Sequence, residues 1–257
     1  MKINDLFSVK DKIVMITGST RGIGRAIAEG FIANGAKVII HGSSEEKAKK
    51  VCQEINAYDF IGASFLNMDE VHEMSNKLKN KFDKIDVLIN NAGFEEHFTI
   101  DKMKIEMLDD IYNVNTKAHY ILTSNLIDLL KKSDYPSIIN VTSIHQLIPV
   151  RENSPYCMAK AALDMFTKVG ALEFGSLGIR VNNLAPGAIA TEMNENLLDD
   201  LEKETGVSFG QWVPLGRVGD KDEMVGPAIY LASKASSYMT GATLFVDGGY
   251  KENLLRY

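Results

Sequence analysis

The chain has 257 residues, of which 45% are hydrophobic and 24% charged, values typical of a globular protein with a sizeable core. Its net charge of −6 and the lack of a long basic run argue against a nucleic-acid binder, and no apolar run approaches the ~18 residues of a membrane span. Two distant cysteines and five histidines without ligand spacing predict neither a disulfide nor a metal site, and no apolar leader precedes the first strand, so we expect a cytoplasmic protein.

Short β-branched runs alternate with longer amphipathic segments along the whole chain. Strands are predicted at 12–17, 37–41, 60–66, 87–90, 137–142, 180–184 and 243–246, and helices at 24–34, 45–56, 69–82, 107–131, 156–175 and 221–233. The strands are nearly continuous apolar runs, which is typical of parallel strands covered on both faces. The pattern predicts an α/β fold, a doubly wound (Rossmann-type) seven-stranded parallel sheet with helices on both faces, in a single domain spanning residues 1–257.

A glycine-rich turn at residues 17–24 follows the first strand directly and opens the first helix. Glycines permit a tight turn and let the backbone approach a pyrophosphate, which the N–H groups at a helix N-terminus favour. The spacing is G-x-x-x-G-x-G, not G-x-G-x-x-G, and the absence of a following G-K-[S/T] disfavours a P-loop NTPase. The predicted nucleotide-binding residues of this turn are Gly18, Ser19, Thr20, Arg21, Gly22, Ile23 and Gly24.

Tyr156 and Lys160 lie four residues apart in a predicted helix and therefore share one face. A free tyrosine has a pKa of about 10 and a free lysine of about 10.4, so neither is a good base near neutral pH. A neighbouring cation lowers the pKa of a phenol towards the range of acid–base catalysis. Y-x-x-x-K alone also describes an ordinary helix face, but together with the glycine turn it predicts proton transfer beside a bound nucleotide.

These features together resemble the short-chain dehydrogenase/reductase family over nearly the full chain. The matching pieces are the glycine turn, Asn90 to Gly93, Asn115, Ser143, Tyr156 with Lys160, and Pro186-Gly187 followed by Thr191. The resemblance implies an NADP-dependent oxidoreductase that interconverts an alcohol and a carbonyl by hydride transfer. It also implies a homotetramer, for which the helices 107–131 and 156–175 and the strand 243–246 are candidate interface elements.

The end of the second strand bears on the choice between NADP and NAD. Gly42 stands where NAD-binding members of the family carry an aspartate, whose carboxylate would repel a 2′-phosphate. Ser43, Ser44 and Arg21 could contact that phosphate, so NADP (NADPH) is favoured over NAD. His41 could help, or could be a strand-end histidine that contacts solvent.

The resemblance implies further roles along the chain. Asn67 and Met68 would flank the adenine. Tyr156 would transfer the proton, and Ser143 would bind the substrate oxygen, with Thr142 as a competitor for this role. Lys160 would lower the tyrosine pKa and bind the nicotinamide ribose. Asn115 would hold a water for the proton relay. The remaining implied cofactor contacts are Asn91, Ala92, Gly93, Pro186, Gly187, Ile189 and Thr191.

The substrate is the least specified feature. The segments after the fourth and fifth strands resemble glucose dehydrogenases and related sugar or polyol oxidoreductases, and candidate substrate contacts are Glu95, His97, His145, Gln146 and Ala188. An irregular segment near 188–219 is predicted to be a substrate lid. Its apolar residues Met193, Leu197, Leu198, Phe209 and Trp212 suit core packing, or alternatively a 3-oxoacyl thioester or a steroid. A non-catalytic NADP sensor is the third reading, which the intact proton-transfer residues argue against.

Overall fold

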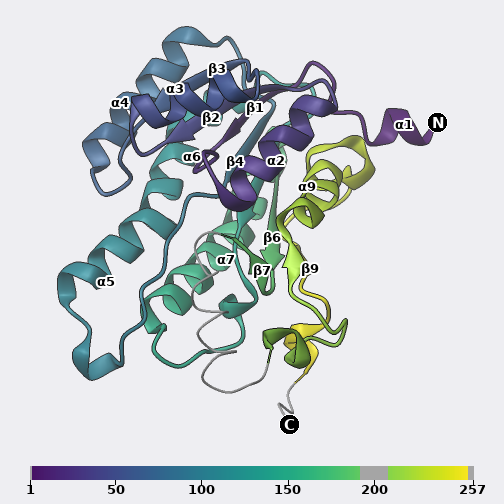
Figure 1. Cartoon of the computed structure of the whole chain (residues 1–257). Coiled ribbons are helices and arrows are strands. Elements are labelled where there is room, and N and C mark those ends of the chain that lie inside the picture. Colours follow the sequence, from purple (N-terminus) through teal and green to yellow (C-terminus); the bar gives the residue numbers. More distant parts are fainter. Residues whose placement is uncertain (1, 192–207, 254–257) are drawn as a thin grey trace.

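The computed structural model describes residues 2–191 and 208–253, in which seven strands form one sheet. Figure 1 shows this sheet with helices packed around it. All neighbouring strands are parallel, in the order β3-β2-β1-β4-β5-β6-β9. This confirms the predicted doubly wound seven-stranded sheet. The strands are β1 Ile13–Ile16, β2 Lys37–Gly42, β3 Asp59–Gly62, β4 Val87–Asn90, β5 Ser137–Val141, β6 Arg180–Pro186 and β9 Thr243–Val246, and the short pair β7 Ile189–Ala190 and β8 Gly219–Asp220 lies apart from them.

Helices cover both faces of this sheet (Figure 1). None within the described part of the chain is long and apolar enough to cross a membrane. The helices are α1 Ile3–Leu6, α2 Gly22–Ala33, α3 Glu45–Glu54, α4 Met68–Lys81, α5 Ile105–Tyr112, α6 Ala118–Leu130, α7 Ser154–Phe174 and α9 Val225–Ala232.

The core has two layers because successive strand residues point to opposite faces. Val14 and Ile16 of β1 pack in the layer formed with α2, α3 and α9, whereas Met15 packs in the layer formed with α4 and α6. All three side chains are fully buried. The near-continuous apolar strands of the sequence are thus explained by burial on both faces.

Two elements differ from their predicted bounds. The third strand ends at Gly62 rather than at residue 66, because its partner β2 ends at Gly42 and the register pairs these two glycines. The predicted helix 107–131 is divided by a π-helical turn, Asn113–Lys117, which contains the buried Asn115. Such wider turns occur often at functional sites, and they leave no clear periodicity signal in a sequence.

The chain order places a crevice at the carboxyl edge of the sheet. From β1 the chain runs outward to β2 and β3, and it then returns to the other side of β1 to form β4. The connections that follow β1 and β4 therefore diverge to opposite faces, which opens a space between them. Ligands of doubly wound sheets bind at this point.

Candidate active site

A cavity of about 520 Å³ occupies this crevice. It is lined by segments that follow β1, β2, β3, β4, β5 and β6, so residues from most of the chain meet there. The predicted site residues in its wall are Gly18, Thr20, Arg21, Gly22, Ile23, Gly24, Ser43, Asn91, Ala92, Gly93, Glu95, His97, Asn115, Ser143, His145, Tyr156, Lys160, Pro186, Gly187, Ala188, Ile189 and Thr191. Ser19, Ser44, Asn67, Met68 and Gln146 do not line it.

The glycine turn is shaped by close backbone approach. Gly18 has a φ of +62°, which side-chain-bearing residues rarely adopt, and a Cβ there would lie 2.8 Å from Cα of Ala92. A Cβ on Gly24 would lie 2.5 Å from the carbonyl oxygen of Gly18. The turn thus leaves an open cradle at the start of α2, with the geometry that a pyrophosphate needs.

His41 holds the glycine turn from beneath. Its Nδ1 accepts a hydrogen bond from the backbone N–H of Gly18 at 3.0 Å, and its Nε2 lies 3.1 Å from the carbonyl oxygen of Ala63. These contacts define a neutral ring protonated at Nε2. Burial lowers the pKa of His41 to about 4, so the ring stays neutral near pH 7. The structure therefore corrects the solvent-facing reading of His41, which is 3% exposed.

Ser19 and Ser44, predicted to bind the cofactor, have structural contacts instead. Ser19 is fully buried. Its hydroxyl donates to the backbone carbonyl of Ile16 and accepts from the backbone N–H of His41. The Ser44 hydroxyl caps α3 by accepting from the N–H of Lys47. Short polar side chains are preferred at both kinds of position, so their presence in the sequence did not distinguish capping from phosphate binding.

The two residues predicted to flank the adenine do not line the cavity. Asn67 caps α4 by accepting from the N–H of Asp69, and Met68 packs against the core. The cavity is lined instead by Ala63, Ser64, Phe65 and Leu66. Asn67 and Met68 thus directly follow the residues that form this wall, and their contact with the adenine stays a prediction.

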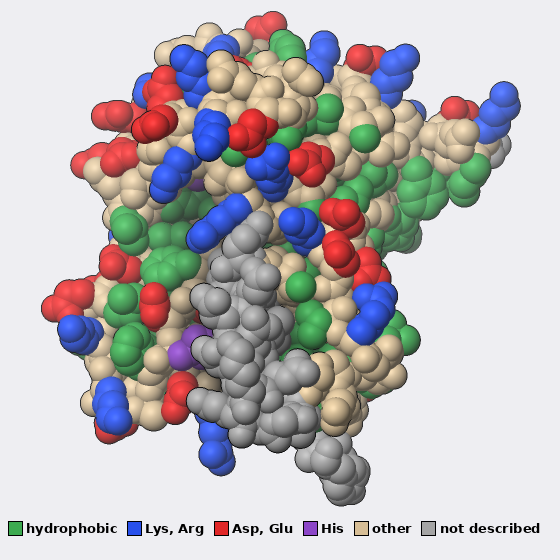
Figure 2. Space-filling view, viewed as in Figure 1, with side chains coloured by type: hydrophobic (Ala, Val, Ile, Leu, Met, Phe, Trp, Pro, Cys, Tyr) green, Lys and Arg blue, Asp and Glu red, His purple; other side chains and the backbone are tan. Residues whose placement is uncertain are grey.

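The region beyond Ser43 is basic. A second hollow, of about 430 Å³, adjoins the cavity and shares Thr20, Arg21 and Ser43 with it. It is also lined by Arg25, Lys47 and Lys50, and by Glu54, which pairs with Arg25 at 3.0 Å. Figure 2 shows lysine and arginine side chains over α2 and α3 on this face. A Cβ at Gly42 would already lie 2.9 Å from the side chain of Thr20, which leaves little room for an aspartate.

Ser143, Tyr156, Lys160 and Asn115 come together at the other end of the cavity. Ser143 follows β5 and hydrogen-bonds the Tyr156 hydroxyl, while its own oxygen accepts from the N–H of His145 at 3.1 Å. Thr142, the competing candidate, is 2% exposed and its hydroxyl reaches the Leu184 carbonyl, so Ser143 is the residue that faces the tyrosine.

Lys160 lies beneath the tyrosine ring. Its Nζ is 5.4 Å from the ring centroid and donates to the carbonyl of Val141 at 2.9 Å. A Cβ added at Gly93 would meet Oδ1 of Asn115 at 2.5 Å and Nζ of Lys160 at 3.5 Å, so both groups border the same small space. The Asn115 amide donates to the carbonyls of Phe94 and Ile111, and its Oδ1 has no partner among the described residues. This geometry suits a bridging water.

The pKa values of this pair are governed first by burial. Burial raises the pKa of Tyr156 above its ordinary value, the Glu95 carboxylate raises it further, and the hydrogen bond with Ser143 lowers it. Burial lowers the pKa of Lys160 to about 8, and Glu95 opposes this shift. The predicted lowering of the Tyr156 pKa by Lys160 is therefore corrected: desolvation dominates and raises this pKa, and the opposing contribution comes from Ser143 instead.

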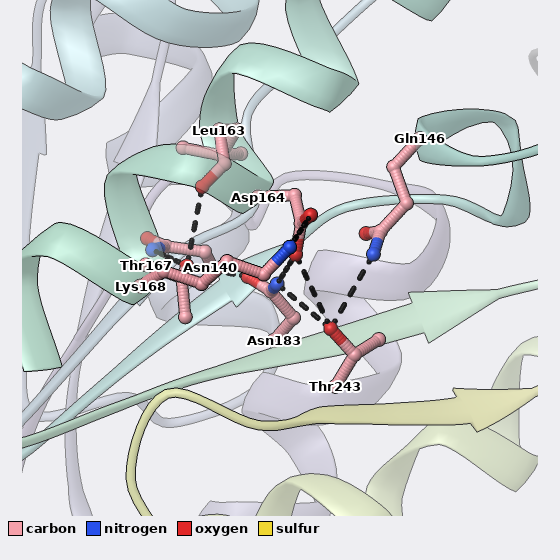
Figure 3. Close-up of polar contacts among 8 residues, drawn as sticks. All are labelled: Asn140, Gln146, Leu163, Asp164, Thr167, Lys168, Asn183 and Thr243. Carbon is pink, nitrogen blue, oxygen red and sulfur yellow. Dashed lines mark hydrogen bonds and ion pairs between the residues drawn. The ribbon is translucent and has the colours of Figure 1, made fainter.

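A hydrogen-bonded network lies behind these residues, between α7 and three strands (Figure 3). Asn140 of β5 donates to Thr167, Thr167 donates to Asn183 of β6, and Asn183 donates to the Asp164 carboxylate. Thr243 of β9 also lies within hydrogen-bonding distance of Asp164. Gln146, predicted to contact substrate, instead donates to Thr243 and so belongs to this network. The network attaches the helix carrying Tyr156 and Lys160 to the sheet.

Part of the predicted lid segment, near 188–219, contributes to the cavity wall. Phe209 lines the cavity and contacts Trp212 and Tyr250 edge to face. It therefore both packs in an aromatic cluster and forms part of the cavity wall. Met193, Leu197 and Leu198 lie outside the described residues. Sequence reasoning missed Asn153 and Val150, which precede α7 and line the cavity. Asn153 had no motif to mark it, because its role depends on a contact with Glu95, 58 positions away.

Comparisons with known proteins agree with this geometry. The family model described as "Enoyl-(Acyl carrier protein) reductase" matches residues 18–251. The 3-oxoacyl-[acyl-carrier-protein] reductase FabG of Chlamydia pneumoniae is 38% identical over 93% of this chain and 96% of that protein. The corresponding reductase of Aquifex aeolicus is 32% identical over 94% of this chain and 98% of its own.

Solved structures of sugar-related enzymes are also similar. A gluconate 5-dehydrogenase from Burkholderia cenocepacia, in complex with NADP and tartrate, has a TM-score of 0.91 and 30% identity, covering 98% of this chain and 99% of that chain. The Thermoplasma acidophilum aldohexose dehydrogenase has a TM-score of 0.84 and 31% identity, covering 96% of each chain.

A doubly wound parallel sheet with a glycine turn and a serine–tyrosine–lysine set at its carboxyl edge defines a nucleotide-dependent oxidoreductase. The similarities above span nearly the whole chain and include relatives over 30% identical. This chain belongs to the short-chain dehydrogenase/reductase family.

Proposed function

We propose that this protein uses NADP(H) to interconvert a secondary alcohol and a carbonyl, with Ser143, Tyr156, Lys160 and Asn115 as its catalytic residues. The observation that carries the proposal is the meeting of Tyr156, Lys160 and Ser143 in one cavity with the glycine turn. The nicotinamide supplies the hydride acceptor or donor when bound. The glycine cradle and Asn91 fit such a cofactor, since Asn91 is fixed by hydrogen bonds to the carbonyls of Thr17 and Gly18.

The chain's own residues account for the proton. Ser143 hydrogen-bonds the substrate oxygen, and Tyr156 gives a proton to that oxygen during reduction or removes it during oxidation. Lys160, whose pKa is lowered by burial to about 8, supplies positive charge beneath the phenol and passes the proton on. Asn115, whose Oδ1 borders the same space as Nζ of Lys160, holds a water that joins Lys160 to solvent in a proton relay.

Replacing Tyr156 with phenylalanine tests this role. Removal of a positioned acid–base group typically costs roughly 10²–10⁴-fold in rate, so Tyr156→Phe should lose turnover of NADPH while retaining NADPH binding, measured by fluorescence titration. Tyr238→Phe is the matched control, because Tyr238 is fully exposed. Turnover that survives in Tyr156→Phe overturns the proposed mechanism.

NADP is the proposed cofactor. Arg21 and Ser43 border both the cavity and the basic hollow, where Lys47 and Lys50 add positive charge, and Gly42 puts no carboxylate near them. The gluconate 5-dehydrogenase of Burkholderia cenocepacia binds NADP, which supports the choice. A comparison of kcat/KM for NADPH and NADH, with Arg21→Ala as the variant, checks it.

Two substrate classes remain for this site. A sugar or polyol is supported by the structural similarity to an aldohexose dehydrogenase, and a sugar-derived substrate more generally by the similarity to a gluconate 5-dehydrogenase, whose named substrate is a sugar acid. A 3-oxoacyl thioester is supported by the sequence similarity to 3-oxoacyl-[acyl-carrier-protein] reductases. A panel of both classes with NADPH discriminates between them.

We also propose a cytoplasmic homotetramer. Cys52 and Cys157 are both free, which suits a reducing compartment. One side of α7 exposes Met158, Met165 and Leu172, at 59%, 56% and 84%. These residues recur at spacing of seven, so they form one apolar stripe suited to a subunit contact. Light scattering of the purified protein measures the oligomeric state.

A further inference from the structure

A carboxylate stands in the wall of the cavity next to the proton-transfer residues. Glu95 lines the cavity, and its side chain is 20% exposed. Its charge raises the pKa of both Tyr156 and Lys160, so it acts at short range on the place where the substrate's reacting oxygen must lie. The proton-transfer step itself does not use this carboxylate.

The carboxylate is held in a fixed position. The side-chain amide of Asn153, which is 1% exposed, donates to Oε2 of Glu95 at 2.5 Å. The residue before Asn153, Glu152, has a φ of +62°. Its backbone carbonyl accepts a hydrogen bond from the backbone N–H of Phe98 at 2.7 Å. A non-glycine residue in this conformation costs free energy and persists only where its surroundings impose it. Two loops are thus joined at the substrate end of the cavity, with Glu95 between them.

No lysine or arginine of residues 2–191 or 208–253 forms an ion pair with Glu95. His97 approaches the same oxygen, Oε2, at 3.9 Å and is the other titratable group beside it. An ionised carboxylate accepts hydrogen bonds and cannot donate them. Oε2 already accepts from Asn153, whereas Oε1 has no donor among the described residues, so Oε1 is the acceptor that this wall of the cavity offers to a bound substrate.

On the basis of the proposed function, we propose that Glu95 is a specificity-determining residue that selects neutral polyhydroxy carbonyl compounds and their alcohols, and rejects sugar acids and 3-oxoacyl thioesters. Hydroxyl groups beside the reacting carbon donate to Glu95, in hydrogen bonds strengthened by its charge. A sugar carboxylate meets like charge in this part of the cavity. A thioester offers only acceptors there, so it displaces water from Oε1 of Glu95 without supplying a donor in its place.

The test compares three substrate classes with the full-length enzyme and NADPH: ketohexoses, keto-sugar acids of the same chain length, and a 3-oxobutanoyl thioester. We expect the wild-type kcat/KM to be highest for the ketohexoses. Glu95→Gln keeps the shape of the side chain and removes its charge. The ratio of kcat/KM for ketohexoses to kcat/KM for keto-sugar acids should therefore fall by roughly tenfold or more, the factor that corresponds to about 1.4 kcal/mol. Glu96→Gln, an exposed neighbour outside the cavity wall, should leave the preference unchanged.

The outcomes separate this inference from the proposed function. If keto-sugar acids or the thioester are reduced as well as ketohexoses, or if Glu95→Gln leaves the ratio unaltered, the selectivity role is wrong while the oxidoreductase assignment stands. If NADPH binds but no member of the three classes is reduced, both proposals are overturned. If Glu95→Gln has the same thermal unfolding midpoint as the wild type, a folding defect is excluded as the cause of a changed ratio of kcat/KM values.

Discussion

The Glu95 carboxylate shifts the pH range in which the tyrosine–lysine pair works. It raises the pKa of both Tyr156 and Lys160, because a negative charge favours their protonated forms. Removing the charge therefore lowers both, and the two groups titrate as one coupled pair. We predict that Glu95→Gln moves the rising limb of the pH profile for alcohol oxidation to lower pH, measured as kcat/KM with NADP. The same variant of Glu96 should not move it, and an upward shift in Glu95→Gln would contradict the electrostatic account.

His41 controls the shape of the glycine turn through a single accepting nitrogen. Phenylalanine can keep the ring contact with Phe65, whose centroid lies 4.5 Å away, but it leaves the N–H of Gly18 without an acceptor. An unsatisfied buried donor costs about 1–3 kcal/mol. We predict that His41→Phe weakens NADPH binding by roughly tenfold or more, measured by fluorescence titration.

Asparagine at position 41 is the informative control, because its carbonyl oxygen can replace Nδ1 as the acceptor. His41→Asn should retain most of the NADPH affinity that His41→Phe loses. Equal affinity in the two variants, with equal loss of thermal stability, would assign His41 a packing role only.

At the scale of elements, the network around Asp164 joins α7 to β5, β6 and β9 (Figure 3). One oxygen of Asp164 accepts from Asn183, and the other pairs with Lys168 at 2.6 Å. An asparagine there would turn an amide donor towards one of these donors. We predict that Asp164→Asn lowers the free energy of unfolding by about 1–3 kcal/mol, measured by urea denaturation. Asp128→Asn is the control, since that carboxylate is 84% exposed and its pair with Lys131 is worth little. Equal stability of the two variants would contradict the role of the network.

The elements show which parts of the fold were readable from the sequence. Strand runs such as Ile13–Ile16 were predicted because burial on both faces makes them continuously apolar. The end of β3 was not predicted, because apolar residues such as Phe65 and Leu66 follow the point where pairing with β2 stops, at Gly62. The π-helical turn at Asn115 was also unreadable, since one extra residue per turn barely disturbs the helical pattern.

The site divides in the same way. Tyr156, Lys160 and the glycine turn were predicted because their partners are local or follow a fixed spacing. His41 and Asn153 were not, because their contacts with Ala63 and Glu95 span 22 and 58 positions. Such contacts depend on which loops the completed sheet brings together.

For the molecule as a whole, two buried histidines should make stability depend on pH. Burial lowers the pKa of His41 to about 4 and that of His119 to about 3, whereas an unfolded histidine titrates near 6.5. Above pH 6.5 both states are neutral at these rings and the histidines contribute no pH dependence. Below pH 6.5 the two histidines are protonated in the unfolded chain but stay neutral in the folded protein. The folded state therefore loses stability as the pH falls from 6.5 towards 4.

We therefore predict that the free energy of unfolding declines between pH 6.5 and 4 with a limiting slope of about 2.7 kcal/mol per pH unit for two histidines, measured by urea denaturation across that range. His41→Asn should reduce this slope, because one of the two rings is gone. His72→Asn should not, because the His72 side chain is exposed and its replacement removes no buried ring. NADPH that binds only the folded state should raise stability at every pH, but it should leave the contribution of His119 to the slope intact, since that ring packs behind Ala92 and its Nε2 bonds the Ala92 carbonyl.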